Sequence, residues 1–525
     1  MKFKLFIFAL LALMTASCTQ EIDILELAEK AGEMITIDVS IPQETRVAYD
    51  DATLKLSWEA NDQILLVGYD NTNNYVGSSK FSWTGIDNKF TGTPVDGATT
   101  YKAYYPASLW LDENGNLQPF IGPFWQRTQN GNNTTGHLKN RLLLFDVEAN
   151  ALNQPFRLSP QSCILKLVLS GIPQEVGALS QIVWTVEIAE GQYKSLLLDV
   201  TGVTFSGSEN SVTAFLPFDP NEIHLAANGQ VSIRLFGAQS YLWSHTVTSE
   251  KNYLPGKRYT GIVTGNWKPI INPLDYVAEY NVNPAGTDFV DNLTACDVSG
   301  YFNWADALGI DISNYHLPNR QEWCSIVPNN HEWVRFDWDK YDPNVSENVT
   351  VQNQAISMTS DYRSPANGTY TSYALRYKGT DMISAWKYQF VSTDYDGFTD
   401  NDTHLKITSR NVAPSVTVHE IADEMFWDHD NGNDVVRCFP ASGYDNSVGT
   451  IVGRGGSCVL WSSTEQSNNA NAAAVMYSYK LLAASSFGLG KLAGTPVRLF
   501  KNPVEDTTGS TENLLIVGDG DDWLN

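Results

Sequence analysis

One short acidic stretch has the residue types of a calcium loop. Asp428, Asp430, Asn431 and Asp434 place oxygen-bearing side chains close together in a turn-rich segment. Calcium takes about six to eight oxygen ligands, but the glycine and glutamate positions of an EF-hand are absent here. We therefore expect no obligatory cofactor. Calcium at this loop is the metal to test, and the alternative is a solvated surface loop.

Cysteine chemistry is the next possibility. No two cysteines have the Cys-x-x-Cys spacing of zinc or redox sites. Cys163 lies in an apolar, strand-like run and is expected to be a buried free thiol. In an exported protein the four cysteines that follow it can form disulfides, although spacing does not establish their connectivity. The expected pairs are Cys296 with Cys324 and Cys438 with Cys458.

No catalytic constellation is visible, and we expect the protein not to be an enzyme. The sequence contains no His-Glu-x-x-His, no Gly-x-Ser-x-Gly and no Walker-type phosphate loop. Glu322 and Glu465 lie in motif-like segments, but packing and capping roles fit both. His316 and His419 are expected to be structural or to face solvent. The formal net charge of −25 repels phosphates and argues against nucleic-acid binding.

The N-terminus reads as an export signal. Met1-Lys2-Phe3-Lys4 precedes an apolar run over residues 5–14, which is too short for a membrane span. Cys18 follows Ala16-Ser17 and resembles a lipobox cysteine, which is lipidated and becomes the new N-terminus; Thr15 departs from the usual leucine. The alternative is an ordinary signal peptide with an incidental cysteine.

Most of the chain predicts β structure. Aromatic and β-branched residues occur in short alternating runs bounded by Gly, Asn, Asp and Pro. Residues 35–41 alternate strictly until Pro42 and predict a half-buried strand. Short helices are expected over residues 304–308 and 320–327, the second preceded by Pro318 and Asn319. A length of 525 residues favours about three domains.

The first half of the chain resembles the fimbrillin family. The similar pieces appear in the family's order over residues 34 to 265, and they imply two packed transthyretin-like β-sandwich domains. The pieces are Thr45-Arg46, a strand with Trp58, Asn61-Asp62, residues 101–106, residues 129–132 with His137-Leu138, and residues 254–259.

The resemblance also implies a processing step at Arg46. Fimbrillins are commonly cut by an arginine-directed protease near this point, which would remove the strand over residues 35–41 and leave a sheet edge open to a strand from a neighbour. The alternative is that Arg46 is only a surface charge. Residues 514–517 are a candidate donor strand, or they pair within their own domain.

The second half is similar to FISUMP domains and their relatives of C-type-lectin-like, α+β architecture. The most specific pieces are residues 317–323, which read Leu-Pro-x-x-x-Glu-Trp, and residues 461–465, which read Trp-Ser-Ser-Thr-Glu. The expected division of the chain is a lipoprotein signal peptide at 1–18, a tether at 19–33, β-sandwich domains at 34–155 and 156–268, a FISUMP-like adhesive domain at 273–503, and a polar linker with a C-terminal strand at 504–525.

Together these features predict a fimbrial accessory or tip subunit that mediates cell adhesion and assembles by strand exchange. The expected partners are other pilus subunits, with a glycan or host surface protein as ligand and a lipid anchor in the outer membrane. The expected location is the cell outer membrane and the fimbrium. The alternative is a pilus-independent, lipid-anchored surface protein that binds glycans or host proteins.

Overall fold

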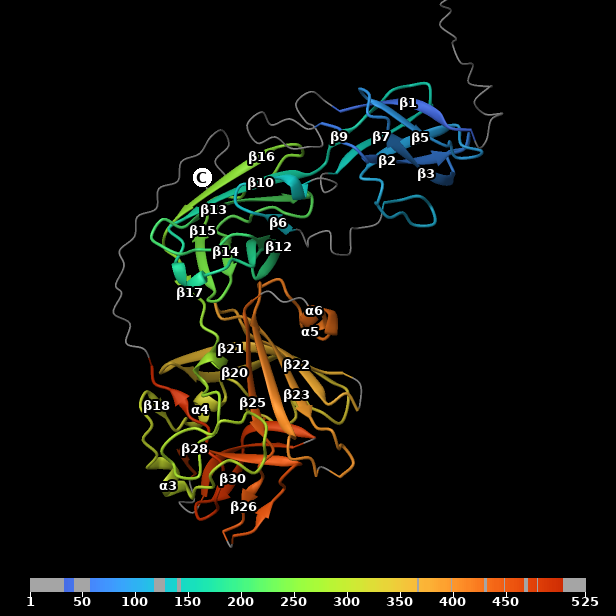
Figure 1. The fold of residues 1–525 in the computed structure, drawn as a ribbon. Helices are drawn as coiled ribbons and strands as arrows, with labels where there is room; N and C mark the ends of the chain where they lie inside the picture. Colours follow the sequence, from blue (N-terminus) through green and yellow to red (C-terminus); the bar gives the residue numbers. More distant parts are fainter. Residues whose placement is uncertain are drawn as a thin grey trace, which may run out of the picture.

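The chain is built mainly of β-strands. The computed structural model describes residues 33–41, 57–117, 128–138, 143–365, 368–397, 399–428, 432–447, 449–466, 471–478 and 480–503. Strands account for 47% and helices for 7%, which confirms the prediction of a mainly β fold. Figure 1 shows three bodies that follow one another along the chain: an N-terminal sheet, a middle sandwich and a larger C-terminal domain.

The N-terminal domain is a single eight-stranded sheet. Its strands are β1 (Ile35–Ser40), β2 (Gln63–Tyr69), β3 (Tyr75–Trp83), β4 (Lys89–Gly92), β5 (Thr100–Tyr105), β7 (Leu144–Asn150), β8 (Phe156–Arg157) and β9 (Ser159–Pro160). They lie in the order β8-β1-β4-β3-β2-β5-β7-β9. The alternation predicted for residues 35–41 is confirmed, because Ile37 and Val39 are buried in the core beside Phe81 and Phe90 while their neighbours are not.

Strand pairing places the end of this domain a few residues beyond the expected boundary at 155. Val39 of β1 pairs with Phe156 of β8, and Leu144 of β7 pairs with Pro160 of β9. The N-terminal sheet therefore extends to Pro160. Conversely, β6 (Thr128–Asn130) pairs in parallel with a strand of the middle domain. Strand β8 thus belongs to the N-terminal sheet and β6 to the middle domain, the reverse of the expected division. Local patterns do not show this because the pairings of β8 with β1 and of β6 with the middle domain join segments far apart in the sequence.

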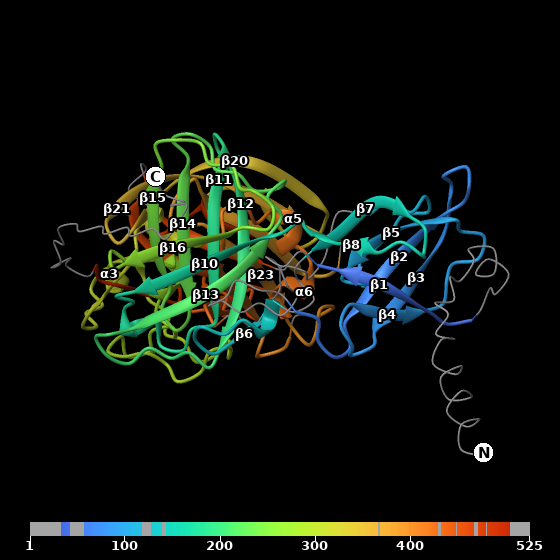
Figure 2. The ribbon, with the colours of Figure 1, turned by 90° about the horizontal axis from the view of Figure 1, so that it is seen from above.

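The middle domain is a two-layer sandwich. Its strands are β10 (Cys163–Ser170), β11 (Gln181–Ala189), β12 (Gln192–Thr201), β13 (Ser211–Phe218), β14 (Gln230–Phe236), β15 (Tyr241–Thr246), β16 (Arg258–Thr264) and β17 (Lys268–Pro269). One sheet has the order β13-β10-β16 and the other the order β17-β15-β14-β11-β12-β6. The two sheets cross steeply (Figure 2) and enclose a core that includes Trp184, Phe218 and Tyr259.

A six-stranded and a four-stranded antiparallel sheet, with two short two-stranded sheets, form the C-terminal domain. Its strands are β18 (Tyr315–His316), β19 (Val334–Arg335), β20 (Lys340–Val351), β21 (Gln354–Ser364), β22 (Thr371–Lys378), β23 (Ser384–Val391), β24 (His404–Asn411), β25 (Asp434–Pro440), β26 (Tyr444–Asp445), β27 (Ile451–Val452), β28 (Ser457–Glu465), β29 (Asn471–Ser478), β30 (Leu481–Gly490) and β31 (Phe500–Lys501). Strands β20 to β25 lie in sequence order, and the second sheet has the order β19-β30-β29-β28. Trp323, Trp386 and Phe439 belong to the main core.

Short helices complete this domain. They are α3 (Trp304–Leu308), α4 (Arg320–Trp323), α5 (Val418–Ile421) and α6 (Glu424–Asp428). Helix α3 matches its predicted bounds, and Asn303 caps it by accepting a hydrogen bond from Asp306 N. Helix α4 starts where predicted, because Asn319 and Glu322 form a capping box, but it ends four residues early at Trp323. Helices α5 and α6 had no sequence prediction.

The three bodies share buried contacts at their boundaries. Ile164 and Phe215 of the middle domain belong to the N-terminal core. At the other domain boundary, Val183 of β11 and Phe236 of β14 pack with Ala413 of the C-terminal domain. The bodies are therefore joined by apolar surfaces as well as by the chain, which favours a fixed arrangement over free rotation.

Candidate functional site

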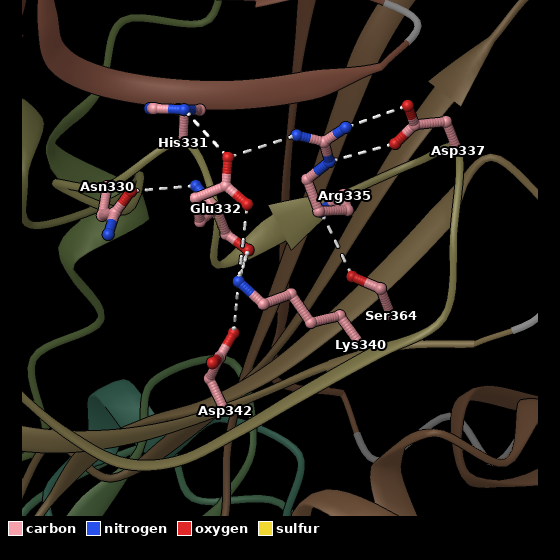
Figure 3. Close-up of polar contacts among 8 residues, drawn as sticks. All are labelled: Asn330, His331, Glu332, Arg335, Asp337, Lys340, Asp342 and Ser364. Atoms are coloured by element: carbon pink, nitrogen blue, oxygen red, sulfur yellow. Dashed lines mark hydrogen bonds and ion pairs between the residues drawn. The ribbon is translucent and has the colours of Figure 1, made fainter.

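A cluster of charged side chains lies where β19 leads into β20 (Figure 3). Arg335 is held by both oxygens of Asp337, with Nε 3.0 Å from Oδ1 and Nη2 2.9 Å from Oδ2. Its Nη1 also lies 3.6 Å from Oε1 of Glu332. Lys340 Nζ lies 3.6 Å from Oε2 of Glu332 and 3.2 Å from Oδ2 of Asp342. Two cations thus stand among three carboxylates.

Strand pairing from both sheets holds this cluster. Arg335 of β19 pairs with Leu481 of β30, and its backbone N donates to Ser364 Oγ at the end of β21, 3.1 Å away. Lys340 begins β20 and pairs with the same Ser364. The ion pairs therefore join the edges of the two sheets, and the Arg335 side chain is only 10% exposed.

An exposed tryptophan lies directly against this cluster. The guanidinium carbon of Arg335 is 4.2 Å from the centre of the Trp338 ring, a cation–π contact. Trp338 nevertheless remains 45% exposed. Because Asp337 holds the guanidinium from its edge, the planar group is free to lie over the ring. The outcome is a large aromatic surface that is ordered and accessible to solvent.

The chemistry available at this site is binding. Within the described part of the chain, no three or more His, Cys, Asp or Glu side chains are grouped so that they could hold a metal ion. Glu332, Asp337 and His331 are partly exposed, so their remaining lone pairs and N–H groups can meet a polar ligand. Stacking on Trp338 and hydrogen bonding to these groups are what the arrangement offers.

Asp434 of the expected calcium loop forms an ion pair with Arg410. Arg410 of β24 lies opposite Asp434 of β25 in the register, and its Nε and Nη2 are 2.6 and 2.9 Å from the two carboxylate oxygens. Asp428 ends α6 and is exposed. Asp430 and Asn431 lie outside the described residues. Calcium binding stays a prediction, and Asp434 gives it no support.

The expected disulfides are not formed, which corrects the sequence prediction. Cys163, Cys296, Cys324, Cys438 and Cys458 are all free. Cys296 Sγ donates to the carbonyl of Thr403 at 3.2 Å, whereas Cys324 follows α4. Cys438 and Cys458 belong to β25 and β28, which are in different sheets. Sequence spacing did not reveal these separate environments.

Burial disfavours the thiolate form of four of these cysteines. Desolvation raises the pKa of Cys163 and of Cys458 to about 12, and the pKa of Cys296 and of Cys324 to about 11. At neutral pH the thiolate, which is the reactive form, is therefore scarce at each of these four positions. Cys163 is the buried free thiol that the sequence predicted.

Glu322 and Glu465, which could be imagined as a catalytic pair, have separate structural partners. Glu322 Oε2 accepts from Asn319 N at 2.7 Å, and its Oε1 lies 2.9 Å from His316 Nε2. That hydrogen bond is the largest contribution raising the pKa of His316. Glu465 forms an ion pair with Lys491. Each carboxylate thus serves local packing.

The lipidation site Cys18, the cleavage site Arg46 and the candidate donor strand over residues 514–517 also lie outside the described residues. Among the residues that are described, no helix combines the length and apolar content needed to cross a membrane.

Arg335 and Trp338 were not singled out from the sequence. A signal was available, since residues 331–340 read His-Glu-Trp-Val-Arg-Phe-Asp-Trp-Asp-Lys and mix aromatic with charged residues. Such a run fits a strand as well as a surface site. The tertiary structure shows that Arg335 is buried and Trp338 stays exposed.

Comparison with known proteins gives one family model that matches part of the chain. Residues 269–500, somewhat less than half of the chain, match the model of a domain of unknown function, DUF8237. No curated protein matches the chain.

Solved structures with some likeness come from Bacteroides. A fimbrial protein of Bacteroides ovatus ATCC 8483 is 12% identical, with 88% of this chain and 98% of that chain covered and a TM-score of 0.23. A candidate cell adhesion protein of Bacteroides fragilis NCTC 9343 is 13% identical over 45% of this chain and 97% of that one, with a TM-score of 0.26. Candidate polysaccharide-binding proteins of Bacteroides thetaiotaomicron VPI-5482 are 9% identical over 45% and 94%, with a TM-score of 0.22. Scores of this size do not by themselves assign a fold or a function.

Proposed function

We propose that this protein is a non-catalytic fimbrial subunit that is lipidated at Cys18, joins its neighbours by strand exchange and presents its C-terminal domain for adhesion. Anchoring of the uncleaved protein in the outer membrane through Cys18 is proposed from the lipobox-like start of the sequence, and cleavage at Arg46 would release the remaining chain from that anchor. The observation that carries the assembly step is the position of β1, the first strand of the N-terminal sheet.

Strand β1 closes a gap between two other strands. Residues Ile35 to Asp38 pair with β4, and residues Val39 and Ser40 pair with β8. Burial of its side chains Ile37 and Val39 contributes about 1.5–3 kcal/mol each to the free energy of unfolding. Losing β1 would leave unpaired backbone groups on both neighbours and an apolar gap between them.

The strand is also removable by one cut. It precedes Arg46 in the sequence, so cleavage there would separate β1 from the rest of the chain without interrupting any other described strand. An incoming strand with alternating apolar residues could then restore both the backbone pairs and the buried side chains. Residues 514–517 of a neighbouring copy are one candidate donor.

The C-terminal domain is the proposed adhesive part, on a C-type-lectin-like scaffold. In support of this scaffold, β18 near the start of the domain pairs with β31 at its end, and Val277 bridges to Phe500. This pairing brings the two ends of the domain together and leaves the remaining loops free to vary. A shared scaffold does not identify the ligand, because binding depends on the side chains of the particular site.

The decisive experiment labels native cells by immunogold electron microscopy with antibody to residues 273–500, using a Cys18→Ala strain as control. Gold confined to filament ends supports a tip subunit. Gold over the envelope without filaments contradicts the fimbrial proposal and favours the pilus-independent, lipid-anchored surface protein.

Processing is tested separately by N-terminal sequencing of the surface protein. Arg46→Ala should keep β1 attached, whereas Arg157→Ala, an exposed arginine of β8, should be processed as wild type. Loss of β1 from the Arg46→Ala protein would show that the cut lies elsewhere.

A further inference from the structure

We propose that Trp338, held by Arg335, is a binding platform for an uncharged saccharide. This inference rests on the adhesive role proposed above and names its ligand class. Exposed aromatic rings bind the apolar C–H face of a pyranose, while nearby polar side chains bind its hydroxyl groups. Trp338 supplies the aromatic ring, and it contacts Arg335 of the charged cluster drawn in Figure 3, which supplies the polar side chains.

The ring is ordered before any ligand arrives. Arg335 lies 4.2 Å from the ring centre and is fixed in turn by two hydrogen bonds to Asp337. The Arg335 backbone is fixed as well, since its N donates to Ser364 Oγ and its carbonyl accepts from Ser372 Oγ. A platform ordered in this way loses less conformational entropy on binding than a mobile side chain would.

Part of Trp338 remains accessible to solvent. The guanidinium covers part of Trp338, yet 45% of the residue is exposed. No other ring or cation contact of Trp338 occurs among the residues that the structure describes. A tryptophan that served only to stabilise the fold would be expected to bury most of this surface.

Arg335, which contacts the ring, is surrounded by hydrogen-bonding groups that are partly exposed. His331 Nε2 is 2.9 Å from Glu332 Oε1, and both side chains are accessible to solvent. Asp337 has spare lone pairs beyond those that Arg335 uses. These groups accept hydrogen bonds from hydroxyls, which is the chemistry that a sugar ring presents around its edge.

The charge of the cluster selects against acidic glycans. Glu332, Asp337 and Asp342 outnumber the two cations Arg335 and Lys340, and the whole chain carries a formal net charge of −25. Sulfated or sialylated chains would therefore be repelled, and more strongly at low salt. Neutral hexose polymers face no such barrier.

Affinity electrophoresis of the full-length protein tests the proposal, with gels containing mannan, dextran or laminarin as neutral probes and heparin as the acidic probe. At least one neutral glycan should retard the wild type, and heparin should not. Trp338→Ala should weaken that retardation by at least about tenfold in apparent affinity. The matched control is Trp110→Ala, because Trp110 is 78% exposed but belongs to the N-terminal domain, and it should bind as wild type.

A second variant tests whether Arg335 orders the ring. Arg335→Met removes the cation and its hydrogen bonds, so Trp338 should become mobile and binding should fall. Asp339→Asn changes an exposed neighbour and should leave binding intact. Thermal unfolding of Trp338→Ala should remain a single transition, with a Tm lowered by no more than about a few degrees, because the residue is 45% exposed.

The outcomes distinguish this inference from the proposed function. Unchanged retardation of Trp338→Ala would place saccharide binding elsewhere and overturn the platform while leaving the adhesive role intact. Retardation by heparin alone would overturn the ligand class, and absence of retardation by all three neutral glycans would overturn the inference. Immunogold labelling of filaments decides the fimbrial role independently of these results.

Discussion

Glu347 and Arg376 form a fully buried ion pair in the C-terminal domain. Glu347 Oε1 lies 3.1 Å from Arg376 Nη2, and the side chains are 1% and 0% exposed. Glu347 also accepts from Ser360 and Tyr362, while Arg376 donates to the carbonyls of Cys324 and Ser325. The pair thus ties β20 and β22 to the segment that follows α4.

Breaking this pair should strongly destabilise the domain. Glu347→Gln keeps the shape but leaves the Arg376 charge uncompensated, and loss of one partner of a buried pair costs about 3–5 kcal/mol. Urea unfolding followed by tryptophan fluorescence should show this loss. Lys89→Ala, which breaks the exposed Lys89–Asp38 pair, should cost less than about 1 kcal/mol. Equal effects of the two variants would contradict the described burial.

His316 should make stability depend on pH. The hydrogen bond to Glu322 raises the pKa of His316 in the folded protein above the value near 6.5 expected when unfolded. The contribution of His316 is therefore full below about pH 6.5 and is lost as pH rises through the raised pKa. The stability difference between wild type and His316→Gln should shrink with rising pH over that window.

His404 provides a control, because its stability contribution should depend on pH in the opposite direction. Burial lowers the pKa of His404, so its protonation opposes folding. Relative to His404→Gln, the wild type should lose stability as pH falls below about 6.5. If the two variants gave parallel pH profiles between pH 5 and 8, the assigned environments would be wrong.

The cysteines should behave as free, slowly reacting thiols. In a Cys18→Ala protein, five thiols should react with Ellman's reagent after denaturation without reductant. In the native protein Cys438 should react first, because it is less buried than the other four. Non-reducing peptide mapping that links Cys296 to Cys324 would restore the disulfide prediction and contradict this structure.

Asp434 should matter for stability without any metal. Asp434→Ala leaves Arg410 without its carboxylate and should cost about 2 kcal/mol in calcium-free buffer. Asp428→Asn, an exposed change on α6, should be close to neutral. Added calcium should not rescue Asp434→Ala. A large calcium-dependent rise in the Tm of the wild type would instead support a metal site in this loop.

Local features were predictable because they depend on neighbours in the sequence. Alternation placed Ile37 and Val39 on the buried face of β1, and Pro318 with Asn319 predicted the start of α4. The end of α4 was predicted too late because its boundary depends on packing against β20 and β28 rather than on a stop signal in the sequence. The sequence also did not predict that β6 pairs in the middle domain and β8 in the N-terminal sheet, because the partner strands lie far away in the sequence.

The sequence by itself determined the β-rich composition, the strand alternation and the helix caps, because these are properties of short segments. Tertiary structure alone decided which distant side chains meet. The register of β24 with β25 places Arg410 opposite Asp434, and the pairing of β19 with β30 helps to hold Arg335 where it meets Trp338. Such contacts depend on how sheets align over long separations, and a shift of one residue turns each side chain to the other face.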